Sequence, residues 1–363
     1  MVQLTVETTT ESYEVFIQSN AYHTFKTHYE TLLNEADRIV IIADEAVAAL
    51  HLTELTSALQ FVADKVHCKT IPAGEKAKTM AVYSDCQSYL LQTGCTRNSI
   101  ILAFGGGATG DLAGFVAASF MRGIRYIQCP TTILAHDSAV GGKTAINMPE
   151  GKNMVGAFHQ PSAVLFQTGL FQTLPPREIR SGLAELLKHA LISDEQWAMT
   201  LLAMDNFIQP TERWLSEELL KGIAVKAQIV GQDEFEQSTR KYLNFGHTFG
   251  HAVEAACNFG DLSHGEAVMI GMAYSLQLSE LLGHTTEAMT DQLIQFMHQH
   301  KYTFEPIFET PFEAFLAYME KDKKVTRGDL NFVLLNGIGY PFVKKISREQ
   351  CEEAFERLKQ RTE

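Results

Sequence analysis

The chain has 363 residues, of which 45% are hydrophobic and 20% charged, and its formal net charge is −13. This length exceeds one ordinary hydrophobic core and favours two domains. The acidic balance, without a stripe of Lys and Arg, argues against nucleic acid as a partner. No apolar run approaches the roughly 20 residues of a membrane span, and the N-terminus lacks the plan of a signal peptide, so we expect no membrane association and a cytoplasmic location. The six cysteines contain no Cys-x-x-Cys pair and are expected to be free thiols.

The first part of the chain alternates short apolar runs with helical patterns. Residues 1–7 alternate like a strand, residues 38–43 and 99–104 read as buried parallel strands, and residues 125–129 form a further strand. This pattern predicts an α/β, Rossmann-like nucleotide-binding domain over residues 1–170.

A glycine-rich loop follows the strand that ends at Phe104. A helix is expected at 112–120, so the backbone N–H groups of the loop and the helix N-terminus could face a pyrophosphate. Gly105, Gly107 and Gly110 match G-x-G-x-x-G. The match departs from the dinucleotide fingerprint, because these glycines follow a later strand and no acidic residue lies about 20 residues onward.

Other segments strengthen the nucleotide hypothesis. Asp44 ends an earlier strand, where it could hold an adenosine ribose. Residues 73–78 form a glycine turn that carries charges, and residues 130–132 offer two threonine hydroxyls at a strand end. Each alone is typical of an ordinary loop, but together they lie where open α/β sheets bind nucleotides.

Beyond Leu174-Pro175-Pro176 the chain is almost wholly helical, with long amphipathic stretches at 267–282 and 348–360. We therefore predict an all-α C-terminal domain over residues 171–363. A helix at 181–190 carries Glu185 and Lys188 three residues apart. A surface ion pair is the ordinary interpretation, but the neighbouring residues are apolar.

Arg240, Asn244, His247 and His251 recur at intervals of four, three and four residues, so we expect all four on one face of a helix. A single His on such a face is more often a satisfied core residue. Two imidazoles one turn apart can share a metal ion, and His264, at an expected helix start after residues 258–261, could be a third ligand. Two His and Glu185 would leave coordination positions open, as a Lewis-acid zinc site requires.

A series of motifs runs in register from about residue 40 to 340: Gly105-Gly106-Gly107 with Asp111, Pro130-Thr131-Thr132, residues 137–143, Gly151-Lys152-Asn153, residues 174–178, Glu185 with Lys188, and residues 244–251. This series closely resembles the 3-dehydroquinate synthase family. The resemblance implies conversion of 3-deoxy-D-arabino-heptulosonate 7-phosphate to 3-dehydroquinate and phosphate, in the shikimate pathway of aromatic amino acid biosynthesis. It also implies a catalytic NAD and a zinc ion, for which cobalt may substitute.

The resemblance assigns residues to each ligand. Zinc falls to Glu185, His247 and His264. The NAD contacts would be Asp44, Ala73, Gly74, Glu75, Lys76, Ala77, Lys78, Gly106, Gly107, Ala108, Thr109, Gly110, Asp111, Thr131, Thr132, Lys143, Lys152, Leu170, Phe171, Gln172 and Thr173. The substrate contacts would be Asp137, Lys143, Asn153, Lys188, Lys226, Glu236, Arg240, Asn244 and His251, with Lys323 or Lys324 closing the site.

Arg122 would reach the substrate phosphate of a second subunit, which implies a homodimer. One departure from the family is visible: Ala46 stands where Asn is common, two residues after Asp44, so one ribose contact is in question.

The implied chemistry explains these residue types. Zinc would polarise a substrate hydroxyl so that NAD can take a hydride, phosphate would then leave by elimination, and hydride return, ring opening and an intramolecular aldol reaction would leave NAD unchanged. Lys188 and Arg240 are expected to bind substrate anions rather than to form structural ion pairs with Glu185 or Glu236. His251 is the candidate for proton transfer near the leaving phosphate.

Three alternatives stay open. A metal-dependent alcohol or glycerol dehydrogenase would share the glycine-rich domain and the His ligands but would not need the Lys and Arg cluster. A related cyclase such as 2-deoxy-scyllo-inosose synthase would differ mainly in carboxylate recognition. A catalytically silent NAD-binding regulator would not need Glu185, His247 and His264.

Overall fold

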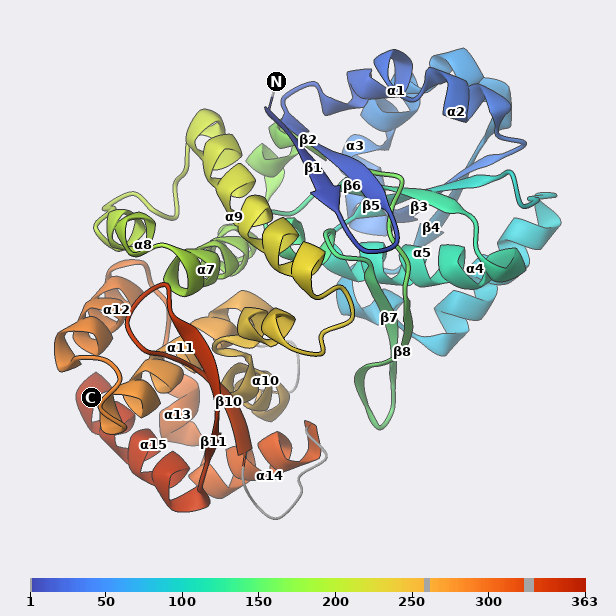
Figure 1. Cartoon of the computed structure of the whole chain (residues 1–363). Helices are drawn as coiled ribbons and strands as arrows, with labels where there is room; N and C mark the ends of the chain where they lie inside the picture. Colours follow the sequence, from blue (N-terminus) through green and yellow to red (C-terminus); the bar gives the residue numbers. More distant parts are fainter. Residues whose placement is uncertain (1, 258–261, 323–329) are drawn as a thin grey trace. The chain divides into compact units, whose positions relative to one another are not determined.

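The structure, a computed structural model, describes residues 2–257, 262–322 and 330–363 and divides into two compact units (Figure 1). Unit 1 comprises Met1–Leu174 and Thr211–Phe235, and unit 2 comprises Pro175–Pro210 and Glu236–Glu363. The sequence analysis placed one division near residue 170. The structure differs from it in that Thr211–Phe235, which contains α9 (Glu212–Gln232), packs on β1 and β2 of unit 1.

Unit 1 is built on a seven-stranded sheet in the order β1-β2-β9-β6-β5-β3-β4. β1 and β2 are antiparallel, and the other neighbouring strands are parallel, as expected for 38–43 and 99–104. The strands are β1 (Val2–Glu7), β2 (Ser12–Gln18), β3 (Ile39–Asp44), β4 (Val66–Ile71), β5 (Ile100–Gly105), β6 (Arg125–Pro130) and β9 (Ala163–Gln167); β7 (Lys143–Met148) and β8 (Gly151–Phe158) form a separate antiparallel pair.

Both faces of the sheet are covered by apolar side chains, because successive residues of a strand point to opposite faces. Ile39 and Ile41 belong to the core that includes Leu55 of α3, whereas Val40 and Ile42 belong to the core that includes Val116 of α5. The helices of this unit are α1 (Thr24–Thr27), α2 (Glu30–Glu35), α3 (Glu45–Ala58), α4 (Met80–Gln92), α5 (Gly107–Ser119), α6 (Ala135–Ser138) and α9, with 3-10 turns η1 (Ala21–His23), η2 (Gln60–Lys65), η3 (Gly74–Ala77), η4 (Phe120–Arg122) and η5 (Thr168–Thr173).

Unit 2 is mostly helical. Its helices are α7 (Pro176–Ser193), α8 (Glu195–Leu202), α10 (His247–Ala256), α11 (His264–Leu281), α12 (Glu287–Gln299), α13 (Glu305–Glu309), α14 (Phe312–Asp322) and α15 (Arg348–Thr362), with a 3-10 turn η6 (Thr239–Asn244). The expectation of an all-α domain needs one correction, because β10 (Leu330–Leu335) and β11 (Pro341–Ile346) form an antiparallel hairpin. β10 is buried at all but one position and β11 is only partly buried, with Lys344 and Lys345 adjacent, so neither strand shows a clear exposed–buried alternation in its sequence.

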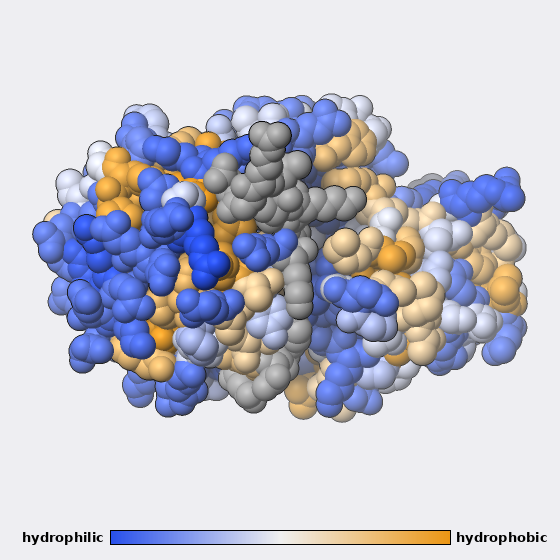
Figure 2. Space-filling view, turned by 90° about the horizontal axis from the view of Figure 1, so that it is seen from below, coloured by the Kyte–Doolittle hydropathy of each residue, from blue (hydrophilic) through white to orange (hydrophobic). Residues whose placement is uncertain are grey.

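The visible surface in Figure 2 is largely hydrophilic, with smaller apolar patches between charged and polar residues. Within the described residues, no helix combines the length and apolarity that crossing a bilayer would require.

Candidate functional site

The predicted nucleotide loops of unit 1 meet at one edge of the sheet. β5 and β6 are parallel neighbours whose last residues, Gly105 and Pro130, face each other. The Thr131 N–H donates to the Gly105 carbonyl (2.9 Å), and a Cβ added to Gly106 would lie 3.1 Å from Thr132 Cγ2. The glycine-rich loop and the threonine loop are therefore in contact, and α5 begins at Gly107 with its free N–H groups at this edge.

Asp44 connects a third loop to the same edge. Its carboxylate caps α3 by accepting from the N–H groups of Ala46 (2.9 Å) and Val47 (3.3 Å), and it also accepts from the Gly74 N–H (3.0 Å). These bonds hold the 73–78 segment beside β3. Asp44 thus has a structural role that the sequence analysis, which considered only a ribose contact, did not foresee.

Lys78 brings predicted nucleotide and substrate residues together. Its ammonium, which is buried, donates to Asp111 Oδ2 (2.6 Å) and to Asn153 Oδ1 (2.5 Å). Burial raises the pKa of Asp111, and the Lys78 charge opposes that rise. Asn147, which the sequence analysis missed, donates to Glu75 Oε2 (2.7 Å) and accepts from the Asn153 N–H (3.0 Å).

The remaining predicted residues of unit 1 lie in different settings. Lys226 of α9 pairs with Asp137 of α6 (Nζ to Oδ1, 3.2 Å). Lys143 begins β7 and Lys152 lies in β8. Leu170 and Phe171 of η5 are buried core residues at the carboxyl end of β9. Arg122 is exposed in a turn and has a positive φ of 71°, which a non-glycine residue rarely adopts.

The four polar residues at helical spacing do not share one continuous helix. Arg240 and Asn244 lie in η6, and α10 begins only at His247. The helical path is interrupted at Gly246, whose φ is +79°. The break lets α10 approach α11 very closely, since a Cβ added to Gly271 would lie 1.8 Å from the Gly246 carbonyl oxygen. The spacing alone could not reveal this contact.

Three histidines of unit 2 nevertheless converge. One ring nitrogen each from His247, His251 and His264 lies within 4.8 Å of the other two. Oε1 of Glu185, on α7, lies 3.5 Å from His247 Nε2 and 3.4 Å from His264 Nε2. Imidazole nitrogens with one buried carboxylate are a donor set that suits zinc or cobalt. The predicted ligands fit a metal ion, and His251 lies close enough to take part.

The far sides of two of these rings also have acceptors. His247 Nδ1 lies 3.1 Å from the Phe245 carbonyl oxygen, and His264 Nδ1 lies 3.2 Å from Glu254 Oε2. Glu254 was missed from the sequence, although it stands three residues after His251 and seven after His247, a spacing that indicates the same helix face.

The electrostatic environments of the two rings differ. Burial lowers the pKa of His247 well below its usual value. Burial also acts to lower the pKa of His264, but hydrogen bonds to Glu185 and Glu254 outweigh it and raise that pKa to about 10. The negative charge that two carboxylates concentrate around His264 is charge that a dication would neutralise.

Lys188 pairs with Glu185, one of the predicted metal ligands. Its ammonium lies 2.5 Å from Glu185 Oε2, and both side chains are only 1% exposed. The sequence analysis expected Lys188 to serve the substrate rather than this carboxylate. The three-residue spacing on α7 and the burial of both side chains favour this ion pair, and the substrate role of Lys188 stays a prediction. Elsewhere in the unit, Arg240 is buried, and Asn244 donates to Glu236 Oε1 (2.7 Å).

The start of α11 is fixed to α7. Ser263 and Glu266 form a capping box, as the expected helix start at His264 required. Glu266 also accepts from Arg180 Nε (3.0 Å), and the Gly265 N–H donates to Ser181 Oγ (3.0 Å). These contacts hold His264 near Glu185. The preceding turn at 258–261 and the lysines at 323 and 324 lie outside the described residues.

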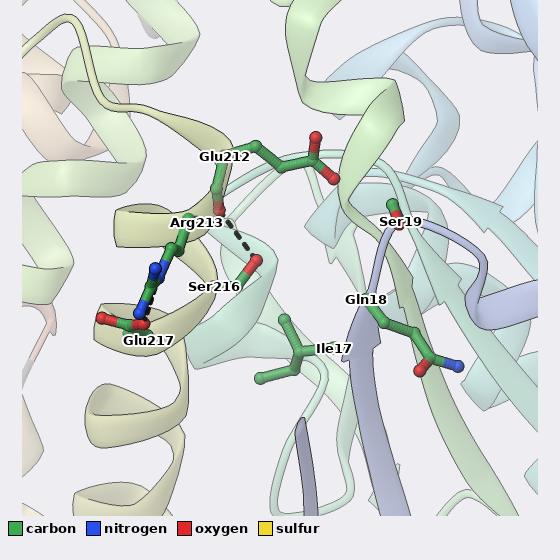
Figure 3. A pocket seen from close by; sticks show the side chains of 7 residues that line it. All are labelled: Ile17, Gln18, Ser19, Glu212, Arg213, Ser216 and Glu217. Atoms are coloured by element: carbon green, nitrogen blue, oxygen red, sulfur yellow. Dashed lines mark hydrogen bonds and ion pairs between the residues drawn. The ribbon is translucent and has the colours of Figure 1, made fainter. Parts of the chain in front are cut away.

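A shallow hollow on unit 1 lies between the end of β2 and the start of α9 (Figure 3). Its lining contains none of the predicted site residues. Arg213 is already paired with Glu217 (3.0 Å), and Ser216 donates to the Glu212 carbonyl oxygen (2.8 Å). We assign no ligand to this hollow.

The chain matches the family described as 3-dehydroquinate synthase N-terminal over residues 68–181 and the family described as 3-dehydroquinate synthase C-terminal over residues 182–325. It is 48% identical to a 3-dehydroquinate synthase of Lysinibacillus sphaericus over 356 residues, which covers 97% of this chain and 96% of the relative. It is 44% identical to one of Listeria monocytogenes over 364 residues, covering 99% and 98%.

Solved structures give a consistent picture. A 2-epi-5-epi-valiolone synthase from Streptomyces hygroscopicus with NAD+ and Zn2+ bound is 28% identical, with a TM-score of 0.86 over 97% of this chain and 98% of the other. A 2-deoxy-scyllo-inosose synthase complexed with carbaglucose-6-phosphate, NAD+ and Co2+ has a TM-score of 0.89 at 24% identity, covering 98% and 100%. A probable glycerol dehydrogenase from Sinorhizobium meliloti has a TM-score of 0.65 at 13% identity, covering 96% of each chain. The last two likenesses concern the fold alone.

Proposed function

Because the chain belongs to the 3-dehydroquinate synthase family, we propose that it converts 3-deoxy-D-arabino-heptulosonate 7-phosphate to 3-dehydroquinate and phosphate, acting as a carbon–oxygen lyase with NAD and a divalent metal ion. The observation that carries this proposal is the convergence of His247, His264 and His251 beside the buried carboxylate of Glu185.

The metal ion would be held by Glu185, His247 and His264. Three protein ligands leave coordination positions for substrate oxygens. A metal ion held by these residues would supply Lewis-acid polarisation of a substrate hydroxyl, and NAD would supply reversible hydride transfer. The structure of the valiolone synthase with NAD+ and Zn2+ bound supports this pair of cofactors.

Unit 1 would bind the nucleotide at its sheet edge. The N–H groups at the start of α5 face the position where a pyrophosphate would bind, and Thr131 and Thr132 add hydroxyls beside it. The buried ammonium of Lys78 holds Asp111 and Asn153 together, which would keep one nucleotide contact and one substrate contact in a fixed relation.

The substrate carries phosphate and carboxylate groups, and cations of this chain would bind them. Arg240 is 1% exposed, so its guanidinium is poorly solvated and would interact strongly with a bound anion. Lys226 would orient Asp137 toward the substrate hydroxyls. An imidazole nitrogen of His251 would carry the proton near the leaving phosphate.

A coupled assay tests the function. Supplied with the heptulosonate phosphate, NAD and zinc, the purified chain should release phosphate without net accumulation of NADH, because the nicotinamide is restored in each turnover. Steady formation of NADH from simple polyols would instead support a metal-dependent dehydrogenase. Binding of NAD without any turnover would support a silent regulator.

We also propose a homodimer in which Arg122 reaches the site of the second subunit. Its exposure and its positive φ support a role outside its own subunit, since such strain persists where function requires it. Sedimentation velocity should give a dimer for the native chain and for Arg122→Met, while this variant should show a raised KM. A monomeric native chain would exclude the proposal.

A further inference from the structure

We propose that Glu254 is a positioning residue of the metal site: its carboxylate fixes the His264 ring with the proton on Nδ1, so that Nε2 is the metal-binding atom. This inference rests on the proposed function, because it assigns a role toward the metal ion. Glu254 would act through the His264 ring and not as a ligand itself.

The geometry places His264 between two carboxylates from different helices. Glu254 Oε2 of α10 lies 3.2 Å from Nδ1, and Glu185 Oε1 of α7 lies 3.4 Å from Nε2. Glu254 is buried, with its side chain only 9% exposed. A carboxylate oxygen can only accept, so the 3.2 Å contact with Glu254 Oε2 requires an N–H on His264 Nδ1.

The tautomer follows from the roles of the two nitrogens. A neutral imidazole carries one N–H and one lone pair, and a metal ion needs the lone pair. A carboxylate accepts a hydrogen bond, so the proton belongs on Nδ1 beside Glu254. The Nε2 lone pair is then left on the side of Glu185 and of the other histidines.

His247 shows the same arrangement with a weaker partner. Its Nδ1 faces the Phe245 carbonyl oxygen (3.1 Å), and its Nε2 lies 3.5 Å from the same oxygen of Glu185. The two rings thus present equivalent nitrogens. The His264 side chain is 32% exposed and the His247 side chain 12%, so His264 is the less enclosed of the two and depends more on an orienting partner.

The test compares metal affinity in Glu254→Ala, Glu254→Gln and the native chain, measured with a chelator competing for zinc. Removal of a carboxylate behind a ligating His typically weakens metal binding by about 10 to 100 times. We expect a loss in this range for Glu254→Ala. Glu254→Gln keeps a neutral acceptor of similar size, so its loss of zinc affinity should be several-fold smaller than the loss in Glu254→Ala. A purely structural role would not produce this partial rescue.

Two spectroscopic measurements report on the ring directly. The visible absorption of the cobalt-loaded protein should change in Glu254→Ala, because the ligand field depends on the orientation of His264. Nitrogen-15 chemical shifts of the zinc-loaded protein should show His264 with its proton on Nδ1 and a metal-bound Nε2 in the native chain, and a mixture of binding modes in Glu254→Ala. Neither measurement depends on catalytic activity.

Glu280→Gln is the matched control. Glu280 is also a carboxylate of unit 2, but it accepts from Arg361 Nη1 (2.7 Å) and Thr290 Oγ1 (2.8 Å) rather than from a histidine. This change should lower the thermal midpoint and leave zinc affinity unchanged.

Zinc affinity within twofold of the native value in a folded Glu254→Ala, with an unchanged His264 tautomer, would overturn the inference. If Glu254→Ala does not fold, unchanged affinity in Glu254→Gln would overturn it equally. A native chain that binds neither zinc nor cobalt would instead refute the proposed function.

Discussion

Three histidine rings share one small volume of unit 2, so removal of one ring tests which of them hold the metal. His264 is expected to be a ligand because its Nε2 faces Glu185 Oε1. His264→Ala should lose zinc while the unit stays folded, as measured by atomic absorption and circular dichroism. His284→Ala, which alters a histidine beside Asn336, should keep its zinc. Stoichiometric zinc in His264→Ala would point to His251 as the ligand in its place.

The buried Glu185–Lys188 pair makes a separate prediction about stability. Lys188→Met would remove one partner of a buried ion pair, a change that typically costs about 3–5 kcal/mol. Denaturant unfolding of the metal-free protein should show this loss, and Lys188→Met combined with Glu185→Gln should recover much of it. Unchanged unfolding with reduced kcat/KM would favour the earlier expectation that Lys188 serves the substrate.

Arg240 offers the contrasting case, since the sequence analysis assigned it to a substrate anion. Arg240→Met should reduce kcat/KM far more than it reduces the free energy of unfolding, because the methionine fills part of a buried volume. Melting temperature and kcat/KM are measured on the same preparation. A large thermal loss with near-normal turnover would assign Arg240 to the structure alone.

At the scale of elements, the close approach of α10 and α11 depends on Gly246. A Cβ there would lie 2.6 Å from Met272 Cγ and 2.9 Å from the Met272 nitrogen, at a φ of +79°. Gly283→Ala is a matched control, since Gly283 has a φ of +74° and nothing within 4 Å. The control should lose about 1–2 kcal/mol from the left-handed backbone alone. Gly246→Ala should lose clearly more in denaturant unfolding and also bind zinc less tightly; equal losses would contradict the packing argument.

The sequence predicted elements whose cause is local. The strands at 38–43 and 99–104, the helix at 181–190 and the helix start at His264 all depend on apolar spacing or capping residues within a few positions. The interruption of the helix at Gly246 could not be predicted, because the spacing of the polar residues from Arg240 to His251 favoured one continuous helix. The reason for the interruption is the close packing of α11 against Gly246. The convergence of Glu185 with the histidines was predicted from the ligand types that zinc prefers. The Lys188 ion pair could not be predicted, because the sequence does not show that both side chains are buried.

At the scale of the whole chain, α9 joins unit 1 although both of its flanking segments belong to unit 2. Gly231 allows this packing, since a Cβ there would lie 2.9 Å from the Glu7 carbonyl oxygen. Glu234 fixes the end of the segment by accepting from Thr10 Oγ1 (2.7 Å), Gln160 Nε2 (2.8 Å) and the Thr9 hydroxyl. One carboxylate thus ties α9 to the β1–β2 turn and to the segment before β9.

This anchor should make the stability of the chain sensitive to acid. Burial alone would raise the pKa of Glu234, but hydrogen bonds from Thr10, Thr9 and Gln160 lower it from 4.5 to about 2. A carboxyl group with a depressed pKa stabilises the folded state above its unfolded pKa, and this contribution is lost as the pH falls from about 4.5 to about 2.

Glu234→Gln should therefore reduce the free energy of unfolding at neutral pH by on the order of 2 kcal/mol and flatten its dependence on pH in that acidic range. The matched control is Glu217→Gln, on α9, the helix that ends just before Glu234; the Glu217 side chain is 54% exposed. This control should stay within about 0.5 kcal/mol of the native chain at every pH, as exposed substitutions usually do. Denaturant unfolding at a series of pH values measures both. If Glu234→Gln kept the native slope between pH 4.5 and 2, the acid sensitivity would have to come from other carboxylates, and the anchoring role of Glu234 would be refuted.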